Sequence, residues 1–389
     1  MRDAVIVEAV RTPVGKGKPN GALAHVHPVE LLAHTLRTLV ERSGIDPALI
    51  DDVIGGTVDQ VGEQAMNTTR YAVLSAGFPE TVPATTVDRQ CGSSQQAVHF
   101  AAQGVLSGAY DIVVACGVES MSRVPMWSNV PVGKDPFGPG VAARYPDGLV
   151  PQGISAELIA AKWSLTREQM DAFAVSSHHK AGAAWDAGLF NDETAPLEGL
   201  TRDESMRPSS TPEILAGLKP AYYDPSFAER FPQIGWNITA ANASPINDGA
   251  SAVLITSSET AERLGLRPLA RLHSFAVTGS DPVLMLTGVI PATEKVLHKA
   301  GLTIDEIDLF EVNEAFSSVV LAWQQETGAD LAKVNVHGGA IAIGHPLGAS
   351  GTRLTTTLVH ALRARGARYG LQTMCEAGGL ANAMILEAV

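Results

Sequence analysis

The chain is organised around residues 87–94, VDRQCGSS, which are expected to join the end of a strand to the start of a helix. The preceding PATT carries the β-branched residues that favour a strand. The following QQAVHFAAQGVLSG carries small and apolar residues at helical spacing, namely Ala97, Phe100, Ala101, Gly104 and Val105. Cys91 is therefore expected where a strand turns into a helix.

That position is chemically useful for a cysteine. Backbone N–H groups at a helix N-terminus and the positive end of the helix dipole stabilise a thiolate. A buried core cysteine is the alternative, but the polar neighbours Asp88, Arg89, Gln90 and Ser93 argue against it. The sequence thus predicts that Cys91 is a nucleophile biased toward the thiolate.

Composition limits what else the protein can be. The chain has 389 residues, 45% hydrophobic and 18% charged, enough for two or three domains with sizeable cores. A formal net charge of −13 argues against nucleic acid or an anionic membrane as the main partner. Three scattered cysteines, without CxxC or HExxH spacing, predict a reducing compartment, no disulfide framework and no metal site. With no targeting or membrane-spanning pattern in the sequence, we expect a cytoplasmic protein.

The chain alternates strands and helices. Short apolar runs at 4–10, 52–56 and 111–117 read as buried strands, and residues 28–44 read as a helix that starts at a proline and ends at a glycine. Such alternation predicts an α/β sheet with helices on both faces. From 119 to 247 prolines and loops dominate, which indicates an insertion with one long helical run at 154–188. Strand and helix patterns resume at 248.

The second half of the chain resembles the first. IDPALIDDVIGG near Asp51 is echoed by LTIDEIDLFEV near Asp308, 257 positions later. GAYDIVVACG at Gly108 is echoed by GARYGLQTMC at Gly366, 258 positions later. Two echoes at nearly one offset predict a duplicated α/β unit, with GHPLGASGTRL opposite the helix of Cys91.

Four reactive side chains fall at element ends: Cys91, Asn313, His345 and Cys375. Ligands of α/β sheets bind outside the carboxyl ends of strands, so these residues are candidates for one shared site. From the residues alone, Cys375 could be either reactive or structural. The remaining candidates are interpreted as structural or solvated: Cys116 in the core, His337 as a structural residue, and His178 and His179 on a solvated helix face.

Taken together, the motifs resemble those of the thiolases over essentially the whole chain. They are VEAVRTPVGK, DRQCGSSQQAV, CGVESMSRVP, ITAANASPINDGASA, EVNEAF and NVHGGAIAIGHPLGASG, followed by a cysteine and glycines. The resemblance implies two duplicated mixed-sheet halves in five α/β/α/β/α layers with an inserted loop domain. We place the N-terminal half at 1–118 and 248–267, the loop domain at 119–247 and the C-terminal half at 268–389. The resemblance also implies homodimers or homotetramers and no cofactor, with coenzyme A as a substrate.

The same resemblance implies roles for the reactive residues. Cys91 would be the acylated nucleophile, and His345 would take its proton. Cys375 would be the acid and base for the second substrate, and Asn313 would hold a water that stabilises the enolate together with His345. The backbone N–H groups of Cys91 and Ala377 would form the second oxyanion hole, around the acyl thioester.

Further residues are implied to bind the substrate. Arg207 would contact the nucleotide end of coenzyme A and Ser244 its pantetheine arm, while Met126, Gln152 and Met285 would line the substrate site. The chain departs from the family pattern at Ala377, where a glycine is usual and a positive φ would cost about 1 kcal/mol. Met126, Gln152 and the long segment 222–237 depart from short-chain biosynthetic members.

These features rank the possible functions. The leading hypothesis is a degradative 3-ketoacyl-CoA thiolase acting through an acyl-Cys91 intermediate on substrates longer or bulkier than acetoacetyl-CoA. The alternative is a biosynthetic acetoacetyl-CoA thiolase using the same residues for condensation. A third possibility, of another class, is a catalytically silent acyl-CoA-binding paralogue.

Overall fold

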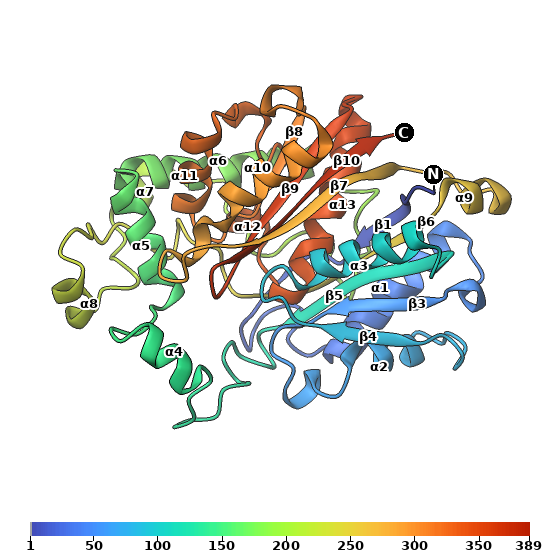
Figure 1. Ribbon diagram of the computed structural model, residues 1–389, viewed down its shortest axis with the longest axis horizontal. Helices are drawn as coiled ribbons and strands as arrows, with labels where there is room; N and C mark the ends of the chain where they lie inside the picture. The colour runs from blue at the N-terminus through green and yellow to red at the C-terminus, as the bar shows by residue number, and fades with distance from the viewer. Residues whose placement is uncertain (1) are drawn as a thin grey trace.

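The computed structural model describes residues 2–389 and contains one mixed sheet of ten strands (Figure 1). The strands run in the order β4-β3-β5-β6-β1-β7-β10-β9-β8, and β2 pairs with β6. Their bounds are β1 Val5–Arg11, β2 Gly15–Lys16, β3 Asp52–Gly56, β4 Ala84–Val87, β5 Ile112–Ser120, β6 Asn247–Thr256, β7 Ala270–Gly279, β8 Leu309–Val312, β9 Tyr369–Glu376 and β10 Leu380–Ala388.

The two halves of the sheet repeat one topology, as the sequence predicts. In the first half, β3 pairs with β5 in parallel, and β6 pairs antiparallel with both β5 and β1. In the second half, β8 pairs with β9 in parallel, and β10 pairs antiparallel with both β9 and β7. The halves meet where β1 pairs with β7 over two residue pairs, Val5 with Arg271 and Ile6 with Ala270. The chain is therefore a duplicated α/β unit.

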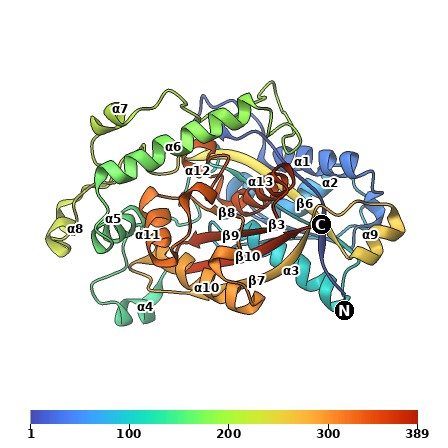
Figure 2. The same ribbon diagram turned by 90° about the horizontal axis from the view of Figure 1, so that it is seen from above.

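Helices cover both faces of each half and fill the space between them (Figures 1 and 2). Their bounds are α1 Pro28–Ser43, α2 Thr68–Ser75, α3 Ser93–Ser107, α9 Ser258–Leu264, α10 Val289–Ala300, α11 Ser317–Thr327, α12 Ala340–Ile343 and α13 Ser350–Arg365. Apolar residues of α3 and α13 share one core with strands of both halves, whereas α1 and α2 pack on the outer face of the first half and α10 and α11 on that of the second. This gives five layers, with α3 and α13 in the middle.

The central helices touch at a glycine. A β-carbon at Gly351 would lie 2.0 Å from the backbone nitrogen of Gln95, so only glycine lets α13 approach the start of α3 this closely. Ser94 Oγ also accepts a hydrogen bond from the backbone N–H of Thr352 at 3.0 Å. The histidine motif and the nucleophile motif thus meet at the centre of the molecule, as the duplication predicts.

The insertion contains five helices: α4 Gly138–Arg144, α5 Gln152–Lys162, α6 Arg167–Asp186, α7 Pro212–Ala216 and α8 Pro225–Arg230. The prediction of one run at 154–188 is wrong, because the chain breaks between α5 and α6. Ser164 has a φ of 52°, and Thr166 starts α6 with a capping box that involves Gln169. Within residues 2–389, every helix is too short or too polar to cross a membrane.

Two further sequence interpretations need correction. Phe100, assigned to the apolar face of α3, is 40% exposed. His178, assigned to a solvated face, is buried and accepts a hydrogen bond from the backbone N–H of Arg207, while its neighbour His179 is exposed. Burial, helped by the Arg207 charge, lowers the pKa of His178 to about 4. Cys116 is fully buried in β5, as expected.

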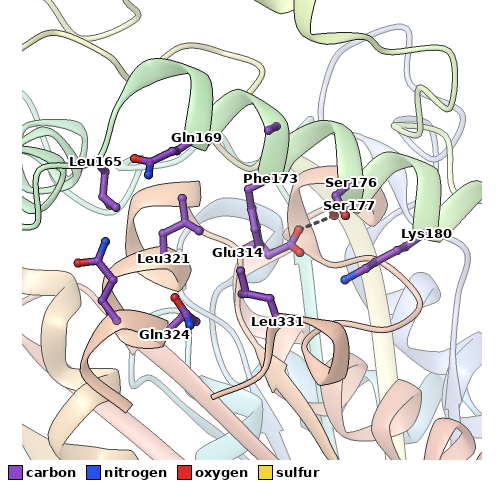
Figure 3. Close-up of a pocket in the computed structure, with 12 residues that line it drawn as sticks. Leu165, Gln169, Phe173, Ser176, Ser177, Lys180, Glu314, Leu321, Gln324 and Leu331 are labelled. Carbon is purple, nitrogen blue, oxygen red and sulfur yellow. Dashed lines mark hydrogen bonds between the residues drawn. The ribbon is translucent and has the colours of Figure 1, made fainter. Parts of the chain in front are cut away.

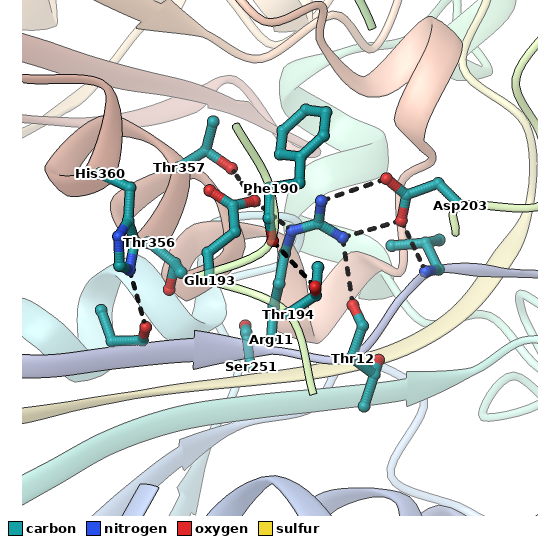
Figure 4. A network of polar contacts seen from close by, with 12 residues as sticks. Arg11, Thr12, Phe190, Glu193, Thr194, Asp203, Ser251, Thr356, Thr357 and His360 are labelled. Atoms are coloured by element: carbon teal, nitrogen blue, oxygen red, sulfur yellow. Dashed lines mark hydrogen bonds and ion pairs between the residues drawn. The ribbon is translucent and has the colours of Figure 1, made fainter. Parts of the chain in front are cut away.

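A buried ion network ties the insertion to the sheet (Figure 4). Arg11, in β1, pairs through Nε with Glu193 Oε1 at 2.5 Å and through Nη1 with Asp203 Oδ1 at 2.8 Å. Glu193 Oε1 also accepts from Thr357 Oγ1 of α13 at 3.0 Å, and Asp203 accepts from the backbone N–H of Val14 at 2.8 Å. Because all three charged side chains are buried, removing Arg11 would leave two buried carboxylates without the cation that pairs with them.

Candidate active site

The nucleophile candidate lies at the turn between β4 and α3. Cys91 is 4% exposed and precedes Gly92, the N-cap residue of α3. Gln90, one residue earlier, has a φ of 50°, and the Ser93 hydroxyl donates to its carbonyl at 2.5 Å. The turn thus holds the thiol at the helix start, as the sequence predicts.

The predicted bias toward the thiolate is wrong. Burial raises the pKa of the Cys91 thiol to about 12, and the charge of Glu376 acts in the same direction. A hydrogen bond from the Gln152 side chain opposes the rise. Desolvation disfavours the charged form more than the helix N-terminus stabilises it. Cys91 therefore holds its proton until a base removes it.

A glycine turn positions His345. Gly344 has a φ of 122°, and a β-carbon there would lie 2.6 Å from Val14 Cγ1 and 2.7 Å from Asn247 Cγ. Asn247 Oδ1 accepts from the backbone N–H of His345 at 3.0 Å. The Nδ2 of Asn247 donates to Gly15 O and to Ser205 Oγ, so this side chain links the histidine loop to β2 and to the insertion.

Hydrogen bonding fixes the tautomer of His345. Its Nδ1 lies 2.6 Å from Ser350 Oγ, and that hydroxyl lies 2.8 Å from the Pro346 carbonyl. The single hydroxyl proton goes to the carbonyl, so Oγ accepts the imidazole N–H from Nδ1 and leaves the Nε2 lone pair unprotonated. Burial, with a smaller effect of the Arg353 charge, lowers the pKa of His345 to about 3. The imidazole is neutral and presents Nε2 as a base.

Asn313 and Cys375 complete the cluster. Asn313 follows β8, and its Nδ2 lies 3.4 Å from His345 Nε2. Cys375 lies near the end of β9 and is fully buried. Burial raises the pKa of the Cys375 thiol well above its ordinary value, the Cys91 charge adds to this, and a hydrogen bond from Asn313 opposes it. The two thiols, the amide and the imidazole therefore share one site.

A buried carboxylate that the sequence analysis did not single out supports the histidine loop. Glu119, in β5, accepts from the backbone N–H groups of Val58 at 2.9 Å and Gly348 at 2.8 Å and from Gln64 Nε2 at 2.6 Å. Burial raises the pKa of Glu119 to about 7 against these hydrogen bonds. The acidic residue of CGVES, between an apolar strand and a loop, is the signal that could have indicated it.

A second carboxylate, Glu314, connects the catalytic loops to the insertion (Figure 3). Its Oε2 accepts from Ser177 Oγ of α6 at 2.7 Å and from the backbone N–H of Ile341 at 3.1 Å, and its Oε1 accepts from Asn335 at 2.8 Å. Glu314 also lines a groove of about 460 Å³ between α6 and α11. None of the four predicted catalytic residues lines that groove, so it is separate from the site.

The predicted binding residues differ in how close they lie to the catalytic cluster. Gln152 opens α5 and reaches Cys91. The backbone N–H of Ser244 donates to Ala315 O, two residues from Asn313, at 2.9 Å. Met285 is buried, with a φ of 37°. Met126, by contrast, is 41% exposed, and Arg207 is exposed as well. The structure thus brings Gln152 to the site, places Ser244 beside the loop that follows Asn313, and leaves Met126 and Arg207 at the surface of the insertion.

The strain that a positive φ would bring at Ala377 is absent. The turn between β9 and β10 takes its positive φ values at Gly378 (83°) and Gly379 (78°), and Ala377 keeps an ordinary φ. Replacing the usual glycine with alanine therefore costs no left-handed strain, and Ala377 retains its backbone N–H as a donor. Among residues 2–389, no group of three or more His, Cys, Asp or Glu side chains is arranged to hold a metal ion.

A duplicated α/β fold with a buried cysteine at a helix start, a neutral histidine and a second cysteine is the arrangement expected of an acyltransferase. Comparison with known proteins narrows the class. Residues 4–259 match the model of the thiolase N-terminal domain, and residues 266–388 match that of the thiolase C-terminal domain. The chain belongs to the thiolase family.

Similar proteins carry related names. The chain is 50% identical to the steroid 3-ketoacyl-CoA thiolase FadA6 of Mycobacterium tuberculosis, covering 100% of this chain and 94% of that protein. It is 40% identical to the 3-ketoacyl-CoA thiolase of Bacillus subtilis, covering 100% of both. The crystal structure of human mitochondrial 3-ketoacyl-CoA thiolase in complex with CoA superposes with a TM-score of 0.88 at 35% identity, covering 100% of this chain and 98% of that one.

Proposed function

We propose that this protein cleaves 3-ketoacyl-CoA thioesters with coenzyme A, through an acyl-enzyme on Cys91. The observation that carries the proposal is the convergence of two buried thiols on a neutral histidine and an amide. Relatives named 3-ketoacyl-CoA thiolase support it.

In the first half-reaction, His345 Nε2 takes the Cys91 proton, and the sulfur attacks the C3 carbonyl. The C2–C3 bond breaks, and its electrons form an enolate whose oxygen is stabilised by His345 and a water held by Asn313. Cys375 then gives its proton to C2, which releases acetyl-CoA. Burial lowers the pKa of His345, so the imidazole is neutral before the reaction and its Nε2 lone pair is free to take the proton.

In the second half-reaction, the Cys375 thiolate takes the proton of an incoming coenzyme A. The coenzyme A sulfur attacks the acyl-Cys91 carbonyl, whose oxygen accepts from the backbone N–H groups of Cys91 and Ala377. Collapse of the tetrahedral intermediate releases the shortened acyl-CoA and the Cys91 thiolate, which takes its proton back from His345 and restores the neutral imidazole. The ordinary φ of Ala377 supports this role, because its N–H is presented without strain.

Mass spectrometry tests the intermediate. Brief incubation with acetyl-CoA is expected to add one acetyl group to the wild-type protein and none to Cys91→Ser, because the serine hydroxyl is a poor nucleophile in this site. Equal labelling of both proteins would show that the acyl group is carried elsewhere. Peptide mapping of the labelled wild type locates the group.

We further propose that the acyl group is longer or bulkier than acetoacetyl. The segment 222–237 supports this, since its aromatic residues form an apolar cluster with α5, the helix that also carries Gln152. The relative at 50% identity is named for steroid substrates, which also favours ring-bearing acyl groups.

A thiolysis series across chain lengths and ring-bearing acyl groups tests the substrate proposal. Each methylene that gains apolar contact adds up to about 1 kcal/mol, so two or three give roughly tenfold or more in kcat/KM. If acetoacetyl-CoA were the best substrate and activity fell at six carbons, the biosynthetic assignment would replace this one.

We also propose a cytoplasmic homodimer or homotetramer. Large apolar side chains exposed on α2 and α3 support self-association, namely Tyr71, Leu74, Phe100 and Leu106. The three free cysteines support a reducing compartment. Light scattering on the purified protein tests the oligomeric state.

A further inference from the structure

A carboxylic acid without a hydrogen-bond partner lies beside the nucleophile turn. Glu376, at the end of β9, is fully buried. Among residues 2–389, no group hydrogen-bonds to its Oε1 or Oε2. An isolated ionised carboxylate in such a place is strongly disfavoured, because it loses hydration and gains no donor.

Glu376 lies in contact with the turn that carries Cys91. A β-carbon at Gly92, the residue after the nucleophile, would lie 1.9 Å from Glu376 Oε1 and 2.9 Å from Asn382 Nδ2. Asn382, in β10, donates its amide N–H to the Gly92 carbonyl at 3.1 Å. The Glu376 carboxyl therefore touches the backbone that carries Cys91. The Asn382 amide donates to the Gly92 carbonyl and not to this carboxyl.

We propose that Glu376 is a positioning residue that controls the ionisation of Cys91: neutral, it lets the thiol give up its proton, and ionised, it keeps the thiol protonated. The proposal takes Cys91 as the nucleophile of the proposed function, but it concerns the thiol's own acidity and can be tested without substrate.

The charges around Glu376 agree with this assignment. Burial raises the pKa of Glu376 to about 8, Asp88 adds to the rise, and Arg89 opposes it. At neutral pH the carboxyl is thus mostly protonated, and the contribution of its charge to the high pKa of Cys91 is largely absent. Above pH 8 the carboxylate forms, and the thiolate must then form beside a second negative charge.

Two other titratable groups near Cys91 keep their protonation state over this pH range. His345 stays neutral, since its pKa is lowered to about 3, and Cys375 stays protonated. Glu119, with a pKa near 7, also acts on Cys91, but its charge is the smallest of the resolved influences. The step expected near pH 8 is therefore specific to Glu376.

Alkylation by iodoacetamide, which is uncharged, reads out the thiolate of Cys91 directly. Rates are measured from pH 6 to 10 by peptide mass spectrometry, so that Cys91 is separated from Cys116 and Cys375. In the wild type, the logarithm of the Cys91 rate should rise with unit slope to about pH 8 and then level off. In Glu376→Gln, which keeps the shape but not the charge, the rise should continue, giving a rate about tenfold above wild type at pH 9 and equal at pH 6.5.

Two variants separate charge from structure. Glu376→Asp keeps an ionisable group and should keep the plateau. Glu311→Gln removes another buried carboxyl, whose pKa burial also raises to about 8. Glu311 is not among the main influences on the pKa of Cys91, so this variant should leave the wild-type profile unchanged. Superimposable wild-type and Glu376→Gln profiles would overturn the proposal. If Glu376→Gln does not fold, the wild type alone still tests the proposal: a logarithm of the Cys91 alkylation rate that rises with unit slope through pH 9 would overturn it. A normal plateau in a protein without thiolase activity would instead contradict only the proposed function.

Discussion

Replacing Ser350 with alanine tests how the base of the site is prepared. Ser350 Oγ is the acceptor, at 2.6 Å, that keeps the proton of the neutral imidazole on Nδ1 of His345. Without that hydroxyl the Nδ1–H is buried and unpaired, and the tautomer protonated on Nε2 is no longer disfavoured. That tautomer directs an N–H, rather than a lone pair, toward Asn313 and the reacting atoms.

The structure sets the expected magnitude. Leaving a buried donor unpaired costs about 1 to 3 kcal/mol, which corresponds to a roughly 5- to 150-fold fall in kcat/KM if it falls on the transition state. The fall should appear mainly in kcat, because Ser350 holds the base rather than the substrate. The same substitution removes a hydrogen bond to Pro346 O and should cost about 1 kcal/mol of folding free energy.

Steady-state thiolysis and urea unfolding separate the two effects. Thr356→Val is the matched control, because Thr356 lies on the same helix and makes the same kind of hydroxyl bond, to the Thr352 carbonyl at 2.8 Å. It should lose similar stability and keep its activity. A folded Ser350→Ala protein with kcat within twofold of wild type would refute the tautomer argument, as would an equal loss of activity in the control.

The remaining predictions address other parts of the molecule. Cys375→Ser should still be acylated at Cys91 but turn over at least about 100-fold more slowly, because a serine hydroxyl does not exchange protons near neutral pH; turnover within a few-fold of wild type would contradict the acid–base role. Arg207→Ala should raise KM for coenzyme A several-fold with kcat unchanged, whereas Arg202→Ala, at another exposed arginine of the insertion, should change neither. Burial lowers the pKa of His99 to about 3, so its contribution to stability is complete above pH 6.5 and is lost as pH falls toward 3. The difference in unfolding free energy between wild type and His99→Leu should therefore be constant above pH 6.5 and shift against the wild type below it.

Much of the fold could be predicted from the sequence because the same α/β unit occurs twice along the chain. β3 and β8 begin at Asp52 and Leu309, and β5 and β9 begin at Ile112 and Tyr369; both pairs are 257 residues apart. Apolar runs of this kind are buried on both faces and are easily recognised. The break between α5 and α6 was missed because the chain turns there without glycine or proline. The T-x-x-Q pattern at Thr166 was the available signal.

The residues that form the site could be predicted from the sequence, but the pKa values of their side chains could not. Motifs indicate which residues meet, yet the pKa of Cys91 depends on how deeply the turn is buried and on what lies across from it. Glu376 follows Cys375 directly, and nothing in the sequence says that its carboxyl reaches the backbone of Gly92, 284 positions earlier in the chain. A helix N-terminus alone would favour a standing thiolate, whereas burial beside a carboxyl favours a protonated thiol. The structure therefore makes Cys91 depend on His345 at the moment of attack, and this dependence ties activation of the nucleophile to the neutral tautomer that Ser350 maintains.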